Sequence, residues 1–165
     1  MAAPKDKVPC LDAELAAFVQ GGVSILAASR VAKRSPAIAR AVGCRVSPNR
    51  RQITLLVASS QAAAFLEGIR STRAIATVFS QPSTHRTIQF KGTDAELAPP
   101  QESDRDLIAA YTRAFCEELA PLGHHPEQIR AVLSCESDDY VAVTFSISTA
   151  YSQTPGPRAG EPLVA

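Results

Sequence analysis

The sequence contains no tryptophan and a single methionine, and aromatic residues make up only 5% of its 165 positions. Alanine, valine, isoleucine and leucine must therefore fill most of the core. Two stretches without a charged residue, 15–29 and 52–66, are 15 residues each, shorter than the roughly 20 apolar residues of a membrane helix. Charged residues at positions 5–7 interrupt the N-terminus, so we expect no secretory signal.

Four cysteines in a chain of this length do not predict a disulfide framework. We therefore expect a cytoplasmic protein with reduced thiols and no membrane association. Hydrophobic residues at 45% and charged residues at 20% indicate a globular protein. The length predicts one domain over 1–165, with irregular tails at 1–10 and 152–165. A net charge of +1 argues against nucleic-acid binding.

The charges are unevenly distributed along the chain. Between Leu15 and Lys91 there are eleven arginines or lysines and one acid, Glu67. Between Asp94 and Asp139 there are eleven acids and three arginines. Two explanations stay open: an acidic helix packs beside the basic strands, or the basic half binds a small phosphate-bearing ligand.

Hydrophobic periodicity and turn residues predict a mainly β protein with flanking helices. The predicted strands are 23–29, 38–46, 53–58, 74–80, 85–97 with a bulge at Gly92, and 140–147. The predicted helices are 11–20, one capped by Ser59 or Ser60 that runs through Ile69, 102–120 and 126–133. Tight turns between strands favour an antiparallel sheet, and a sheet of about six strands in this length is expected to close into a barrel.

The strand after residue 85 alternates between polar and apolar side chains. Residues 85, 87, 89 and 91 are polar and project to one side, while Ile88 and Phe90 project to the other. The hydrogen-bonding edge of a flavin ring suits such a polar row, which includes Thr87 and Gln89. A solvated strand face has the same pattern.

Arg40 and Arg45 lie on one predicted strand, and two guanidinium groups can hold a phosphate dianion. Their offset of five places them on opposite sides of a regular strand, so a shared ligand requires an irregularity, for which Gly43 is suited. Two independent surface arginines are the alternative. The free N–H groups at the predicted helix start, residues 59–61, also suit an anion.

Metal and thiol chemistry find little support in the sequence. His124 and His125 have no common zinc spacing to Cys116 or Cys135, so no metal site is predicted. Cys44 lies in a predicted strand, and we expect it to be buried and unreactive.

Taken in order, these segments resemble the FMN-binding split-barrel family related to pyridoxamine 5'-phosphate oxidase. The resemblance covers about residues 15–97 and, more loosely, the last strand. It is carried by the order of five segments: an arginine-led strand (40–45), an apolar strand (53–58), a serine-containing helix start (59–61), a second apolar strand (74–80) and an alternating strand ending in glycine (86–92).

The resemblance implies an antiparallel split β-barrel and a homodimer with FMN at its interface. By motif position, the cofactor-binding residues would be Arg40 and Arg45 at the phosphate, Leu56 and Val57 through their backbones, Ser59, Ser60 and Gln61 at the helix start, and Thr87 and Gln89 at the ring edge. Gln61 and Ala62 stand where the oxidases carry an Arg-Lys pair. The oxidases' C-terminal residues for pyridoxal phosphate have no match here.

The implied function is an FMN-dependent oxidoreductase acting on an unidentified small molecule, with NADH or NADPH as candidate electron donors. Oxidation of pyridoxamine phosphate itself is not expected. Two alternatives stay open. One is a non-enzymatic flavin or haem binding or storage protein, and the other is a structural dimer with a degenerate cofactor site.

Overall fold

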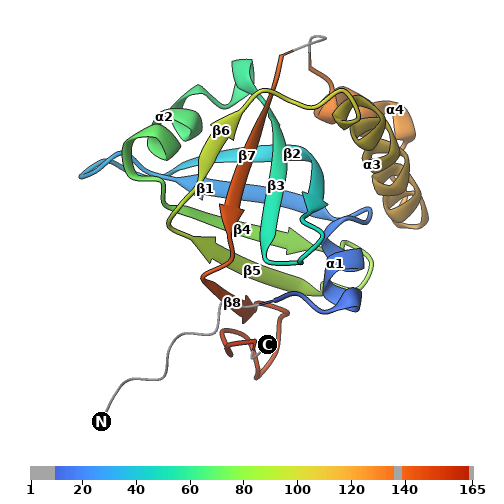
Figure 1. Ribbon diagram of the computed structural model, residues 1–165. Coiled ribbons are helices and arrows are strands. Elements are labelled where there is room, and N and C mark those ends of the chain that lie inside the picture. Colours follow the sequence, from blue (N-terminus) through green and yellow to red (C-terminus); the bar gives the residue numbers. More distant parts are fainter. Residues whose placement is uncertain (1–9, 136–138, 164–165) are drawn as a thin grey trace.

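The computed structural model describes residues 10–135 and 139–163 (Figure 1). The strands are β1 (Ser24–Ser29), β2 (Ala37–Val46), β3 (Gln52–Ala58), β4 (Ile75–Ser80), β5 (Thr87–Gly92), β6 (Glu96–Ala98), β7 (Tyr140–Ser146) and β8 (Thr149–Ser152). The helices are α1 (Ala13–Val19), α2 (Ala63–Thr72), α3 (Asp104–Leu119) and α4 (Pro126–Leu133), with 3-10 turns at Ser59–Gln61 and Ala120–Leu122. The protein is therefore mainly β with flanking helices, as predicted.

All eight strands form one antiparallel sheet in the order β6-β7-β3-β2-β1-β4-β5-β8. The long strand β2 pairs with β3 on one side and with β1 on the other, so it joins two halves of the sheet. The β2–β3 register shifts between Ala41 and Gly43, which is the irregularity that the sequence suggested at this glycine. The bulge lets β2 bend from one half into the other.

The expected closure into a barrel was wrong. The described residues form eight strands where about six were expected, and the edge strands β6 and β8 do not pair with each other. The sheet therefore remains open. The predicted strand 85–97 is two strands, because β5 ends at Gly92 and β6 pairs with β7 in the other half.

Gly92 is not a bulge, since the β4–β5 register runs evenly to its end. This position instead needs a small residue for packing. A Cβ added there would lie 2.6 Å from Phe145 Cδ2. The glycine thus marks a close approach between β5 and β7 rather than a break in pairing.

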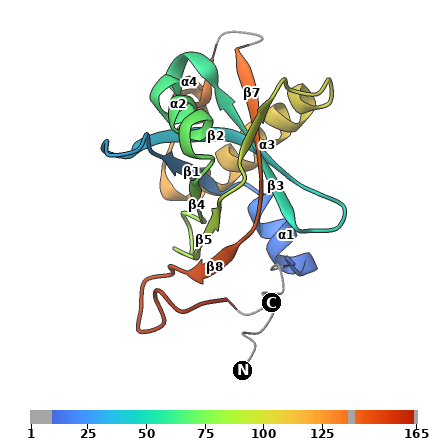
Figure 2. The ribbon, with the colours of Figure 1, turned by 60° about the vertical axis from the view of Figure 1, so that its left-hand side comes forward.

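The core lies between the two halves of the sheet. One half contributes Ile25, Phe79 and Phe90, and the other contributes Ile53 and Phe145, all at most 1% exposed. Figure 2 shows α2 and α1 at opposite ends of the molecule. Aliphatic residues supply most of the remaining buried side chains, as the low aromatic content requires.

Helix α3 packs on β2, and α4 packs on α3 at one side of the sheet (Figure 1). The phenol of Tyr111 donates a hydrogen bond to the carbonyl of Val23 at 2.8 Å. Gly22 permits this close approach, because a Cβ there would lie 2.3 Å from the carbonyl oxygen of Ala114. The described part of the chain contains no helix that is both long and apolar enough to span a membrane.

The segment 153–163, after β8, forms no helix or strand of its own, but it is attached to the sheet. Tyr151 forms an isolated antiparallel bridge with Pro162. The N–H of Ser152 donates to the carbonyl of Glu161 at 2.9 Å, and the N–H of Leu163 donates to that of Ala150 at 2.9 Å. The segment therefore lies along the outer edge of β8. Of the predicted N-terminal tail, residues 1–9 lie outside the described part.

Candidate cofactor-binding face

The half-sheet β2-β1-β4-β5-β8 exposes a continuous face to solvent. The strand registers place five side chains opposite one another in a row across it: Arg40, Leu26, Val78, Gln89 and Tyr151. A neighbouring row contains Ile38, Ala28, Ala76, Lys91 and Thr149. We call the side of the sheet carrying these two rows the outer face. Leu26 is 37% exposed and Ile38 is 69% exposed, so no helix covers them.

Arg40 is exposed at one end of the first row. Its Nη1 donates a hydrogen bond to the hydroxyl of Ser24 at 3.1 Å. Among the described residues it has no carboxylate partner. It lines a cavity of about 320 Å³ together with Phe115 and Ile129 of the helical layer. The guanidinium therefore remains able to bind an external anion.

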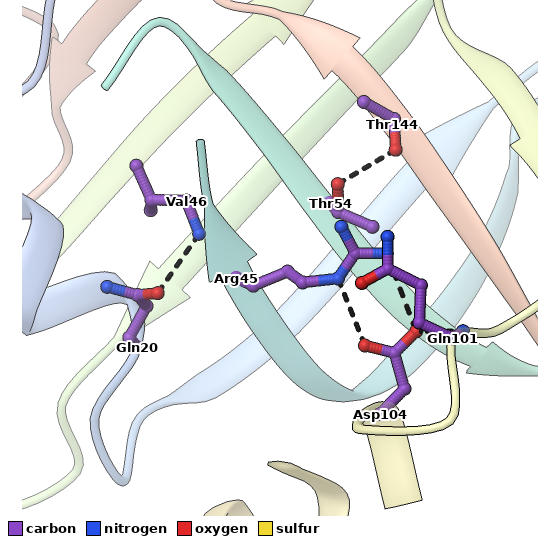
Figure 3. Close-up of polar contacts among 7 residues, drawn as sticks. All are labelled: Gln20, Arg45, Val46, Thr54, Gln101, Asp104 and Thr144. Carbon is purple, nitrogen blue, oxygen red and sulfur yellow. Dashed lines mark hydrogen bonds and ion pairs between the residues drawn. The ribbon is translucent and has the colours of Figure 1, made fainter. Parts of the chain in front are cut away.

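The bulge turns both arginines toward the α3 side of β2, but Arg45 forms an ion pair within the protein. Its Nε lies 3.0 Å from Asp104 Oδ1 and its Nη2 lies 3.4 Å from Oδ2 (Figure 3). Asp104, in the first turn of α3, is 1% exposed and also accepts the N–H of Gln101 at 2.7 Å. Arg45 thus neutralises a buried carboxylate.

The two arginines are also directed to different places. Five residues of extended strand span about 16 Å. Arg45 contacts the first residue of α3, whereas Arg40 lines a cavity with Phe115 near the other end of that helix. The structure therefore does not bring the two guanidinium groups together around one ligand.

The predicted anion site at residues 59–61 already holds a carboxylate. Ser60 N–H donates to Asp139 Oδ2 at 2.9 Å, the Ser59 hydroxyl donates to Oδ1, and Ser59 N–H donates to the Asp139 carbonyl at 2.8 Å. The side chain of Gln61 donates to the carbonyl of Ser134 at 3.2 Å. The hydrogen bonds from the two serines hold the pKa of Asp139 below its ordinary value, although desolvation opposes them.

The predicted capping role of Ser59 or Ser60 was wrong. These residues form a separate 3-10 turn, and α2 begins after Ala62 without a side-chain cap. The Ser59 hydroxyl, which as a cap would have accepted a hydrogen bond from a helix N–H, instead donates to Asp139, 80 residues along the chain. The sequence contained no local signal for that contact.

Leu56 and Val57 lie in the centre of the sheet and are fully buried. Leu56 is paired with Gly43 on one side and with Ala142 on the other, and Val57 with Ala41 and Val141. Strands β2 and β7 thus flank β3 at Leu56 and Val57, the two residues whose backbones the resemblance assigns to cofactor contacts. The bulge in β2 is the place where this pairing is irregular.

Strand β5 has the predicted alternation, with Ile88 and Phe90 buried and the polar residues turned outward. Thr87 is bound within the protein: its hydroxyl pairs with that of Ser80 and donates to the carbonyl of His85 at 3.0 Å. Gln89 is half-buried, and its amide has no hydrogen-bond partner among the described residues. Gln89 thus offers both a donor and an acceptor at the middle of the outer face.

The structure supports the first explanation of the uneven charge, and the phosphate-bearing ligand stays a prediction. Arg45 pairs with Asp104, and Arg73 pairs with Glu96 at 2.6 Å, so acids of the second half do compensate arginines of the first. Arg40 and Lys91 have no such partner within the described residues. The cations that remain uncompensated therefore include two on the outer face.

Cys44 is 4% exposed, as expected, and burial raises the pKa of its thiol well above the ordinary value despite the nearby Arg45. Within the described residues, no group of three His, Cys, Asp or Glu side chains could hold a metal ion. The sequence analysis gave no role to Asp104, Asp139 or Tyr151. An acidic residue in the first turn of a predicted helix is the sequence signal that could have identified Asp104.

Solved structures of other proteins share the fold of this chain. HupZ of Group A Streptococcus is 14% identical with a TM-score of 0.53, and the match covers 91% of this chain and 100% of HupZ. A candidate pyridoxamine 5'-phosphate oxidase from Lactobacillus delbrueckii is 15% identical with a TM-score of 0.51, over 86% of this chain and 93% of that one. The chain has the split-barrel fold of the pyridoxamine 5'-phosphate oxidase-related proteins. The fold implied by the sequence resemblance is thereby confirmed.

An F420 reductase has the same split-barrel fold, with 10% identity, a TM-score of 0.51, and coverage of 81% of this chain and 92% of that one. No protein-family model matches the sequence, and no curated protein matches it. At these identities the likeness is one of split-barrel architecture. The chemistry of the site has to be argued from the side chains of this chain.

Proposed function

We propose that this split-barrel protein binds a flavin on its outer face and acts as an oxidoreductase on a small molecule. The observation that carries the proposal is the row formed by Arg40, Leu26, Val78 and Gln89. Among the described residues, the cation at one end has no carboxylate partner and the side-chain amide at the other has no hydrogen-bond partner, and two apolar side chains lie between them. Two of the structurally similar proteins are named as an oxidase and a reductase, which supports the same class of chemistry.

The residues present fit a flavin in part. Three strand spacings of about 4.8 Å separate Arg40 from Gln89, a span of about 14 Å. Arg40 would hold the phosphate, Leu26 and Val78 the apolar surface of the ring, and Gln89 the polar ring edge. A bound flavin would supply hydride transfer. Arg45 and Ser60 do not fit the phosphate role, because each already binds a carboxylate of this chain.

We further propose that a second copy of the chain covers the outer face. Exposed apolar side chains such as Leu26 and Ile38 on an otherwise ordered sheet are typical of an interface. Ile38→Asp is expected to turn a dimer into a monomer in light scattering. Leu122→Asp, which alters a 48% exposed side chain in the 3-10 turn after α3, is the matched control. A monomeric parent protein would refute the dimer.

The test of flavin binding is the absorption spectrum of the purified protein, with mass analysis of whatever it releases on denaturation. Titration of the cofactor-free protein with FMN should give at least tenfold weaker binding for Arg40→Ala, since a charge-assisted contact is lost. Arg70→Ala, an exposed arginine on α2, is the control. Gln89→Leu is expected to shift the flavin reduction potential at unchanged stability. Protein that neither carries nor binds flavin would refute the proposal.

One observation favours a second candidate, a binding protein without redox activity. Asp104 and Asp139 already bind Arg45, which the resemblance puts at the phosphate, and the helix start at residues 59–61, which it assigns to cofactor contacts. A protein that binds flavin but whose flavin is not bleached by NADH or NADPH would support this candidate. Bleaching by either donor would exclude it.

A further inference from the structure

A cavity lies at one end of the outer face, along β1, β4, β5 and β8. Its volume is about 630 Å³, within the range of about 300–1,000 Å³ typical of small-molecule sites. Ala28 and Ala76 are direct neighbours in the β1–β4 register and form its floor. Longer side chains, including Pro36 and Tyr151, rise around them. Two alanines side by side thus leave a shallow, flat hollow in the sheet.

The charges around this cavity are all positive. Arg30 and Lys91 line it, and none of its described lining residues is an acid. Neither cation has an ion-pair partner among the described residues. The ammonium of Lys91 instead lies 5.2 Å from the centre of the Tyr151 ring. A cation held against an aromatic ring at the wall of a flat hollow is suited to a ligand that combines a ring with an anionic group.

A third feature of the cavity is an unpaired hydroxyl. Thr149 lines it, and the buried Oγ1 of this residue has no hydrogen-bond partner in the described part of the chain. Buried polar atoms are nearly always paired in folded proteins, so an exception calls for an explanation. A rotation of the Thr149 side chain would present the hydroxyl to a ligand in the cavity.

From these three features we infer that the cavity binds a small aromatic anion, with Lys91 and Arg30 holding the anionic group and Thr149 donating a hydrogen bond. The shared chemistry covers both ring carboxylates and ring phosphates. The ring would lie on Ala28 and Ala76, beside Tyr151. That the ligand is the substrate of a flavin rests on the proposed function, whereas its binding to the cavity does not.

The test is a fluorescence titration of flavin-free protein with 2-naphthoate, 2-naphthyl phosphate and the uncharged 2-naphthamide. The chain has no tryptophan, so the naphthalene signal is read against tyrosine alone. We expect at least one of the two anions to bind at least tenfold more tightly than the amide, and the tighter anion identifies the group. Binding by neither anion, or equal binding of the amide, would overturn the inference.

Three variants locate the site. Lys91→Gln should weaken binding of the anion at least tenfold, and Arg70→Gln, which removes an exposed cation from α2, should leave it unchanged. Thr149→Val removes the unpaired hydroxyl at nearly constant shape. It should leave the ligand-free protein at least as stable and weaken anion binding several-fold. Unchanged affinity in both Lys91→Gln and Thr149→Val would place the anion elsewhere and refute the inference.

The outcomes separate this inference from the proposed function. A protein that binds flavin at Arg40 but no naphthalene anion would leave the flavin proposal intact and refute the anion site. A protein that binds the anion at Lys91 but no flavin would support the anion site and refute the flavin proposal. If the protein binds both, faster bleaching or reoxidation of the flavin on addition of the anion would identify this class of anion as the substrate.

Discussion

Replacing Asp104 by asparagine tests whether the Arg45–Asp104 pair stabilises the packing of α3 on the sheet. The variant keeps the shape of the side chain and removes its charge, which leaves the Arg45 guanidinium without a counter-charge. Removing one partner of a buried pair costs about 3–5 kcal/mol. The Arg45 side chain is 29% exposed, so solvent screens part of its charge and we expect a loss of about 2–3 kcal/mol.

Urea unfolding followed by far-ultraviolet circular dichroism measures this loss, with an unchanged slope as the sign that the same surface is exposed. For a chain of this length the melting temperature should fall by roughly 5–10 °C. A loss below about 0.5 kcal/mol, the range of surface pairs, would show that the pair stabilises nothing measurable. The double variant Arg45→Met with Asp104→Leu should recover much of the loss, because no unpaired charge remains.

The same pair changes how cofactor binding has to be tested. Arg45→Ala would leave the buried Asp104 carboxylate without its partner, so a loss of flavin in that variant would reflect disturbed packing. Arg40→Ala removes a side chain whose described partner is one serine hydroxyl. Arg40 alone is therefore the informative position, and the unfolding curve of each variant must accompany its flavin titration.

Three further predictions concern the remaining contacts. Hydrogen bonds from two serines lower the pKa of Asp139. Their stabilisation of the folded protein is therefore present above the ordinary carboxyl pKa and is lost as pH falls through the lowered value. The difference in unfolding free energy between the parent and Asp139→Asn should shrink on acidification, and a constant difference would contradict this. Gly22→Ala should lower the unfolding free energy by about 2–3 kcal/mol, because the new methyl meets a rigid backbone carbonyl of α3. Gly43→Ala meets a movable leucine side chain and should lower it by about 1 kcal/mol in the same urea assay. Iodoacetamide should modify the exposed Cys10 and leave the buried Cys44 intact in the native protein, as read by mass spectrometry of its peptides.

Much of the fold followed from local pattern. The apolar spacing of α4 and the alternation of β5 gave the right elements, and Gly43 marked the bulge. Strand β6 was not separated from β5 and β8 was not predicted, because three or four residues carry no usable periodicity. They exist because neighbouring strands offer unpaired backbone groups, which is a property of the assembled sheet.

The candidate site could be predicted only in its parts. Arg40 and Gln89 were named from residue type and strand alternation. Their position in one row depends on the order β2-β1-β4-β5, which sequence order does not reveal. The carboxylates on Arg45 and Ser60 come from residues 59 and 79 positions away, respectively. Long-range partners of this kind leave no local signal, so the sequence overstated the number of anion-binding groups.

The two ends of the strand order also limit how copies of this molecule can meet. β6 is only three residues long, and the segment that bridges Tyr151 to Pro162 runs beside β8, so neither rim presents a long row of free amides and carbonyls. Growth by strand addition, the usual route to fibrous aggregates, is thereby discouraged at both rims. Self-association is left to the broad surfaces, where it is finite and where a trapped ligand would be shielded from bulk solvent.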